Sequence, residues 1–321
     1  MKQRLLSLFV MLFISLSLAA QKKTDSVSLA KEKDTVIKVN ENYVTLSEIV
    51  VNNKLDVPSF IDRVKNDTTF YKAFRNLHIV GYTALNDIRM FNKNGKITAS
   101  LRSKTRQIRS GNCRSMQTLD ETVTGNIYDD EKNFNYYTAQ MYAGLFFTKD
   151  TICGENNIVK GRDFSTGGLH GMEKHKEQLK MLFFNPGKKI SGIPFISNKT
   201  AIFDESMADK YDMDIDYKMY DSIPCYVFTI KVKKGMENKV VIDEMTTWFT
   251  EKKFDIVARY YTLGYDAGVY DFHIDMKVQM NKIDDLLVPT VISYNGNWKA
   301  IFKKRERGVF TATLFDFVRE E

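Results

Sequence analysis

Two histidines and a glutamate near the middle of the chain have residue types that could bind a metal. His170, Glu173 and His175 lie close together in the sequence. Zinc proteases place two histidines four residues apart on a helix, with a glutamate beside the first. Here the histidines are five residues apart, a rotation of about 140° on a helix, so the two rings would not converge. We therefore expect a surface helix start at this point, and we predict no metal site.

A row of acidic residues is the second candidate for metal chemistry, namely Asp212, Asp214 and Asp216. A calcium loop also needs a glycine at its sharp turn and a distal bidentate glutamate, and neither is present. The interleaved Met213 and Ile215 instead predict a strand with a solvated acidic face. His273 stands alone among the polar residues of a later strand, and one histidine makes no metal site.

The chain contains none of the common catalytic motifs. It has no Gly-x-Ser-x-Gly elbow, no phosphate-cradling glycine loop and no dinucleotide fingerprint. Enough Ser, His and Asp residues exist for a triad, but no spacing singles one out. The basic run at 303–307 is interpreted as a solvated turn, with contact to lipid headgroups or phosphate as the alternative. We predict a noncatalytic protein without catalytic residues or cofactor, and an unrecognised hydrolase stays open.

The stretch from Tyr270 to Met280 organises the elements that remain. Apolar and polar residues alternate strictly along it, which predicts a β-strand with one buried and one wetted face. At ~3.3 Å per residue this strand would be about 36 Å long, and strands of that length bend around a barrel interior, a half-barrel or a helix.

The apolar side of such a sheet is the candidate binding site. Large aromatic residues and flexible methionines suit a hollow for variable apolar ligands. The predicted lining residues are Phe228, Ile230, Trp248, Tyr270, Phe272, Ile274 and Met276. The alternative is that helices fill the concavity and that these residues form an ordinary core.

Helices and further strands surround this sheet. Asp56 and Pro58 mark a helix start, and further helices are expected at 135–147 and 171–184. Hairpin strands are expected on either side of the turn at 92–95, and an antiparallel meander runs from Tyr211 to Val318. The predicted fold class is therefore α+β, a large curved antiparallel sheet (an open half-barrel) with helices in or over its concave face. We expect one β-rich domain at 43–321, with a less regular insertion at about 109–206.

The N-terminus has the pattern of an exported protein. A short basic region, an apolar run and small residues predict a signal peptide over residues 1–20, with an uncleaved anchor as the alternative. Residues 21–42 are polar and are expected to be a disordered linker. The formal net charge of +7 is spread along the chain and gives no support for nucleic-acid binding. Of the three cysteines we favour a Cys113–Cys153 disulfide, with three free buried thiols as the alternative.

Two stretches look like segments of known envelope proteins. Tyr43–Val51 resembles short apolar segments near the N-termini of envelope proteins in Bacteroidota-like bacteria, although an ordinary edge strand is the alternative. Residues 221–232 and 246–259, with Trp248, a turn at Glu251–Lys253 and Arg259, resemble the strand–turn–strand of LolA/LolB-like lipoprotein-localisation carriers. That resemblance implies a half-barrel with helices as a lid that carries acyl chains. The middle third of this longer chain has no counterpart in that family.

These observations predict an exported Gram-negative protein in the periplasm or on the inner side of the outer membrane. The predicted partner is a lipid, or the acyl chains of a lipoprotein, bound without catalysis. The alternative is a scaffold protein that uses the sheet edge or the strand at Tyr43–Val51 to pair with a partner such as an outer-membrane protein.

Overall fold

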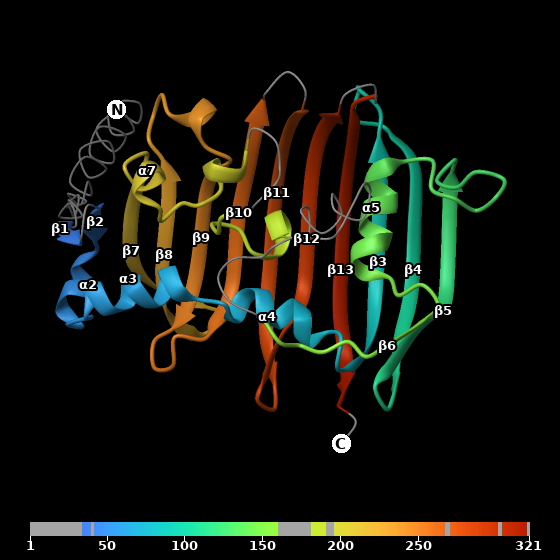
Figure 1. Cartoon of the computed structure of the whole chain (residues 1–321), viewed down its shortest axis with the longest axis horizontal. Helices are drawn as coiled ribbons and strands as arrows, with labels where there is room; N and C mark the ends of the chain where they lie inside the picture. Colours follow the sequence, from blue (N-terminus) through green and yellow to red (C-terminus); the bar gives the residue numbers. More distant parts are fainter. Residues whose placement is uncertain are drawn as a thin grey trace, which may run out of the picture. The chain divides into compact units, whose positions relative to one another are not determined.

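The computed structural model describes residues 34–39, 42–159, 181–190, 196–266, 270–300 and 304–319. One sheet holds all the strands of this part of the chain (Figure 1). They are β1 (Thr35–Val39), β2 (Asn42–Leu46), β3 (Gly81–Phe91), β4 (Ile97–Ser110), β5 (Cys113–Gly125), β6 (Thr151–Cys153), β7 (Tyr211–Tyr220), β8 (Ile223–Val232), β9 (Ile242–Thr250), β10 (Ile256–Asp266), β11 (Tyr270–Ile283), β12 (Leu286–Ala300) and β13 (Glu306–Val318).

The sheet is open and mixed. Its strand order is β1-β2-β7-β8-β9-β10-β11-β12-β13-β3-β4-β5-β6, so β1 and β6 are the edge strands among the described residues. Neighbouring strands run antiparallel except β2 and β7, which are parallel. The predicted open α+β architecture is confirmed, and the one parallel pair is the departure from the expected antiparallel sheet. The parallel pair arises because β3 to β6, which follow β2 in the sequence, lie at the other end of the sheet. The chain then returns and places β7 beside β2.

The alternating stretch that begins at Tyr270 forms the expected strand. β11 continues to Ile283 and pairs antiparallel with β10 on one side and β12 on the other. A β-bulge between Gln279 and Met280 shifts its register against β12. The expected hairpin between β3 and β4 also forms, and Gly95 in its turn has the positive φ of 77° that favours glycine.

Helices lie on one face of the sheet, which we name the inner face; the opposite face is the outer face (Figure 1). The described helical segments are α2 (Glu48–Asn52), α3 (Val57–Asn66), α4 (Thr69–Asn76), α5 (Tyr137–Phe146), residues 181–184, α7 (Glu205–Ala208) and the short 3₁₀ turns η1 (Ser197–Lys199) and η2 (Glu237–Lys239). α3 begins where Asp56 accepts a hydrogen bond from the Ser59 backbone N–H at 3.3 Å. α4 packs on β12, and α5 packs on β13.

α5 is held to the sheet at its N-terminus by a glutamate from a distant strand. Glu306 of β13 accepts hydrogen bonds from the backbone N–H groups of Tyr137 at 3.0 Å and Thr138 at 2.8 Å. A carboxylate here supplies partners for orphan N–H groups and complements the helix dipole. The neighbouring Gly308 permits the close approach, since a Cβ there would lie 3.3 Å from Thr138 Cγ2.

The N-terminal part of the chain differs from the prediction. The predicted signal peptide, residues 1–20, lies outside the described residues. Strand β1 lies within the stretch expected to be a disordered linker, because its backbone pairs with β2. The expected strand at Tyr43–Val51 divides into β2 and the helix α2. β2 is no edge strand, since β1 and β7 flank it.

The middle of the chain is more regular than expected. β5 and β6 extend the main sheet within the predicted insertion at 109–206, and α5 covers β13. The expected helix at 135–147 is confirmed as α5. Of the one expected at 171–184, residues 181–184 are described as helical, and the rest, with His170, Glu173 and His175, lies outside the described residues.

Candidate ligand-binding pocket

The structure places five of the seven predicted lining residues on the inner face. Phe228 and Ile230 of β8 are fully buried, and Ile274 and Met276 of β11 are almost fully buried. Phe272 is half-buried and packs against Tyr265, with ring centroids 6.2 Å apart. The residues of β8 and those of β11 share a face, but strands β9 and β10 lie between them.

Trp248 does not join this set. It pairs with Val227, whereas Phe228 pairs with Thr247, so the alternation of strand side chains turns Trp248 to the outer face. There its ring lies 4.6 Å from that of Tyr260. The side chain of Tyr270 lies outside the described residues.

The inner face around these residues is packed and not open. Phe60 of α3 contacts Phe228 at 6.3 Å and Phe249 at 5.4 Å between ring centroids. Beside Met276 the open space measures only about 10 Å³, which is about one water molecule. These residues therefore form the core that we gave as the alternative to a hollow.

A larger pocket of about 570 Å³ lies further along the inner face, between the C-terminal half of α4, α5, and strands β3, β5 and β6. One wall of this pocket is apolar and largely aromatic, formed by Tyr71, Phe74, Leu145, Phe146, Phe147 and Phe184. Phe74 and Phe184 are stacked with their ring centroids 4.1 Å apart, and Phe146 meets Phe184 at 5.6 Å. Such stacked rings form a rigid apolar surface.

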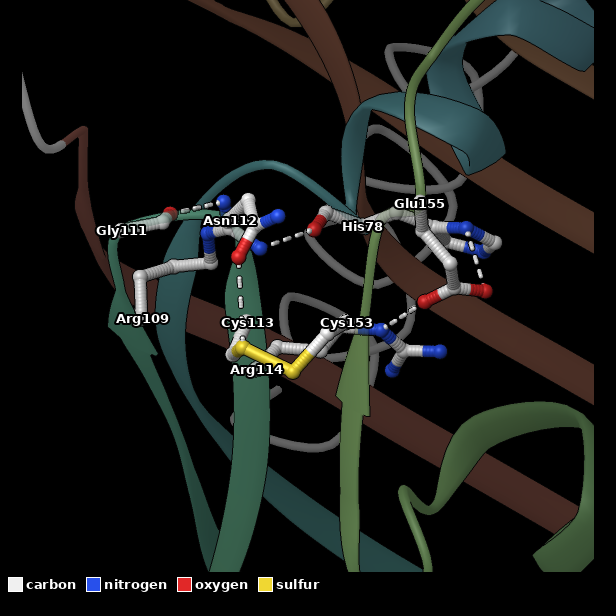
Figure 2. The surroundings of a disulfide bond; sticks show 8 residues. All are labelled: His78, Arg109, Gly111, Asn112, Cys113, Arg114, Cys153 and Glu155. Atoms are coloured by element: carbon white, nitrogen blue, oxygen red, sulfur yellow. Dashed lines mark hydrogen bonds and ion pairs between the residues drawn. A yellow bond between two sulfur atoms is a disulfide. The ribbon is translucent and has the colours of Figure 1, made fainter.

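The other end of the pocket is polar and carries an ion-pair cluster (Figure 2). Arg114 of β5 donates from Nε to Glu155 Oε2 at 2.5 Å. The same carboxylate lies 3.2 Å from His78 Nδ1 through its other oxygen. Arg114 Nη1 also donates to Gln107 Oε1 at 3.0 Å and to Thr148 Oγ1. Arg114 is thus held in one orientation at the end of the pocket.

Two pKa shifts describe this environment. Burial alone would raise the pKa of the Glu155 carboxyl, but the Arg114 hydrogen bond and the charges of His78, Arg114 and Arg75 outweigh burial and lower that pKa from its ordinary value. Glu155 is therefore an anion at neutral pH. Burial raises the pKa of Tyr82 to about 12, so this lining residue is neutral.

A disulfide anchors the segment that carries Glu155. Cys113 of β5 and Cys153 of β6 form a disulfide (Figure 2), and they are the pair that the sequence favoured. The two cysteines are register partners in adjacent strands. Arg114 pairs with Ile152 and therefore turns to the other face, toward the pocket. Cys225 is free and buried, and burial raises the pKa of its thiol.

Polar residues occupy inward positions of β3 and β4, and one of them, Gln107, accepts a hydrogen bond from Arg114 of the pocket. The buried members are Asn86, Ser103, Thr105 and Gln107. Asn86 Nδ2 donates to Thr105 Oγ1 at 3.1 Å, and Gln107 Nε2 donates to the carbonyl oxygens of Leu77 at 2.6 Å and Val80 at 2.7 Å. These groups are satisfied, as buried polar groups must be.

The residues of this pocket were not among those predicted from the sequence. His78, Arg114 and Glu155 come from three separate segments, and no spacing connects them. One signal was available: in β4 the inward positions change from apolar, at Ala99 and Leu101, to polar. Polar inward positions mark the part of a sheet where a dry core ends.

Within the described residues, no three or more His, Cys, Asp or Glu side chains converge as metal ligands. In the same part of the chain, no helix combines the length and apolar character needed to cross a bilayer.

No family model and no curated protein matches this chain. Several solved structures are similar to it, among them the following two. A DUF1329 family protein from Desulfovibrio piger is 14% identical, with 79% of this chain and 94% of that chain covered and a TM-score of 0.25. A putative outer membrane lipoprotein-sorting protein domain from Vibrio parahaemolyticus is 7% identical, with 78% and 91% covered and a TM-score of 0.25. The second is named as a protein of the class that the sequence resembles.

Proposed function

We propose that this protein binds an amphiphile without catalysis, holding a lipid or a lipoprotein acyl chain in the pocket between α4, α5 and β6. The pocket itself is the observation that carries the proposal. Its volume of about 570 Å³ lies within the ~300–1,000 Å³ of typical small-molecule sites. This function is the one that the sequence resemblance implies, but the site is different from the predicted one.

The two ends of the pocket match the two parts of such a ligand. Each methylene group that moves from water to the aromatic wall gains ~0.8 kcal/mol. Phe74, Phe146 and Phe184 supply that wall, and their stacking holds it in place without the ligand. Arg114 and His78 lie at the polar end, where a ligand head group can meet a guanidinium and an imidazole. Few specific groups are needed, which fits a binding protein.

The compartment belongs to the same proposal. The Cys113–Cys153 disulfide is typical of proteins that fold in an oxidising environment. With the predicted signal peptide, it favours an envelope protein of a Gram-negative, Bacteroidota-like cell, in the periplasm or on the inner side of the outer membrane.

The test is uptake of a fluorescent long-chain fatty acid by delipidated protein. We expect saturable binding with an emission change on entry into the apolar wall. Ala143→Trp, which places an indole in the pocket from α5, should abolish this uptake. Lys72→Trp on the exposed side of α4 is the matched control and should bind as the wild type does.

Circular dichroism and thermal unfolding separate a blocked pocket from a damaged fold. If Ala143→Trp unfolds, Ala143→Leu is the milder variant and should weaken uptake in a folded protein. Absence of uptake by wild-type protein, or equal uptake by folded Ala143→Trp, would refute the proposal.

A further inference from the structure

The polar end of the pocket already holds a carboxylate, and it comes from the protein itself. Glu155 lies just after β6 and places one oxygen on Arg114 Nε and the other near His78 Nδ1, at 2.5 and 3.2 Å. Figure 2 shows both contacts converging on this one side chain. A carboxylate between a guanidinium and an imidazole, at the end of an aromatic pocket, has the arrangement of a bound acidic head group.

The charges that line the pocket do not balance. Four permanent cations line it, namely Arg75, Arg114, Lys132 and Lys149, and Glu155 is the one carboxylate among the described lining residues. Arg75 donates from Nη2 to the Asn156 carbonyl at 2.7 Å. Its Nε is buried and has no hydrogen-bond partner among the described residues. The pocket therefore has surplus positive charge and an unused cationic donor, which an anion would satisfy.

The backbone of the segment that carries Glu155 is held on both sides of this residue. The disulfide at Cys153 and the pairing of β6 hold its start. Gly154, directly before Glu155, has a φ of 76°, and a Cβ at this position would meet no other atom within 4 Å. After Glu155, the Asn157 side chain donates to Asn76 Oδ1 at 2.8 Å. The backbone at Gly154 and Asn156 is hydrogen-bonded to Asn112 and Arg75, so the displacement of Glu155 from Arg114 needs only a change in the rotamer of its side chain.

We infer that the pocket takes amphiphiles with an anionic head group, and that Glu155 occupies the place of that head group when the pocket is empty. The ligand anion replaces Glu155 on Arg114 and satisfies Arg75 Nε. Its chain lies along the aromatic wall. This inference rests on the proposed function and adds the head-group class and the internal competitor.

The experiment compares ligands that share a chain of sixteen carbons and differ in the head group. Hexadecanoate, hexadecyl phosphate and hexadecanol each displace a neutral fluorescent naphthylamine from the delipidated full chain. Charged hydrogen bonds of this kind change affinity about tenfold or more, so the anions should bind the wild type about tenfold tighter than the alcohol. The two anions show whether carboxylate or phosphate fits better.

Glu155→Gln is the decisive variant, because it keeps the shape of the side chain and removes the competing charge. It should bind the anions about tenfold tighter than the wild type does and leave the affinity for hexadecanol unchanged. Arg114→Gln should weaken binding of the anions and spare the alcohol. Glu244→Gln on the outer face is the matched control, with its partner Lys231 far from the pocket, and should change nothing.

Equal affinity of the wild type for acid and alcohol, or no gain of anion affinity in Glu155→Gln, would overturn the inference. In either case binding of hexadecanol would leave the proposed function standing. Failure of all three ligands to displace the probe would remove both.

Discussion

The inner face of the sheet has two regions. Both are made of strands with alternating side chains, but helices cover one region closely and leave a pocket over the other. In the sealed region, β7 to β10, the inward side chains are mostly apolar, with Thr247 and Arg259 as polar exceptions, and helices α3 and α4 close over them. In the pocket region, β3 to β6, inward positions become polar and the helices leave an opening. The period of the pattern is the same in both regions, and only the chemistry of the inward residues differs. Apolar packing of helices is favoured where the inward residues are apolar, and the pocket lies beside the part of the sheet where they become polar.

The arginines of the two regions show the same contrast. Arg259 in the sealed region is almost fully buried, lies 3.7 Å from Asp67, donates to Thr247 and stacks on Phe70. Arg114 in the pocket region forms its ion pair with Glu155, and both residues line the pocket. The first arginine fixes the packing of α4 on the sheet, whereas the second lines the pocket.

Removing a buried ring from the sealed region should have the largest effect on stability. Phe228→Ala leaves a cavity beneath Phe60 and Phe203 and should lower the free energy of unfolding by ~3–5 kcal/mol. Phe147→Ala, at the pocket, should cost clearly less because that side chain is half-buried. Urea denaturation measures both, and fatty-acid uptake should fall only in Phe147→Ala. Equal stability losses would mean that the two regions are packed alike.

The sequence supported the sheet and its strands well, because alternation is a local signal. Tyr270–Met280 predicts β11 directly, and Asp56 with Pro58 predicts α3. The same rule misplaced Trp248, since its face depends on the register with β8 and not on its neighbours in the sequence. Register depends on which residues of two strands pair with each other, and the alternation within one strand does not reveal that pairing.

The pocket could not be predicted for a related reason. His78, Arg114 and Glu155 are brought together by the pairing of β5 with β6 and by the position of α4. Whether a concavity is filled depends on how closely helices approach the sheet, which Glu306 and Gly308 control for α5. Nothing local to either residue shows that α5 lies above it.

The buried ion pair of the sealed region should matter next. Arg259→Met leaves the largely buried Asp67 without its cation and should cost ~3 kcal/mol in the free energy of unfolding. In the double variant with Asp67→Asn, the loss should be smaller than the sum of the two single losses. Both charges of the pair are then removed together, so no unpaired charge stays buried. Chemical denaturation measures this coupling. Ligand uptake by folded Arg259→Met should equal that of the wild type, and a loss there would connect the two regions.

The smallest expected effect is a pH dependence confined to the pocket region. The folded pKa of Glu155 lies below its ordinary value of 4.5, so its ionised form stabilises the folded segment. That stabilisation is complete above the unfolded pKa and is lost as the pH falls through the folded value. Hydrogen exchange of amides 151–158, corrected for the intrinsic pH dependence, should therefore rise below about pH 4.5 relative to amides of β8 and β9. Glu155→Gln should lack this rise while Glu244→Gln keeps it. If Glu155→Gln showed the same rise, a different carboxyl group would control the segment.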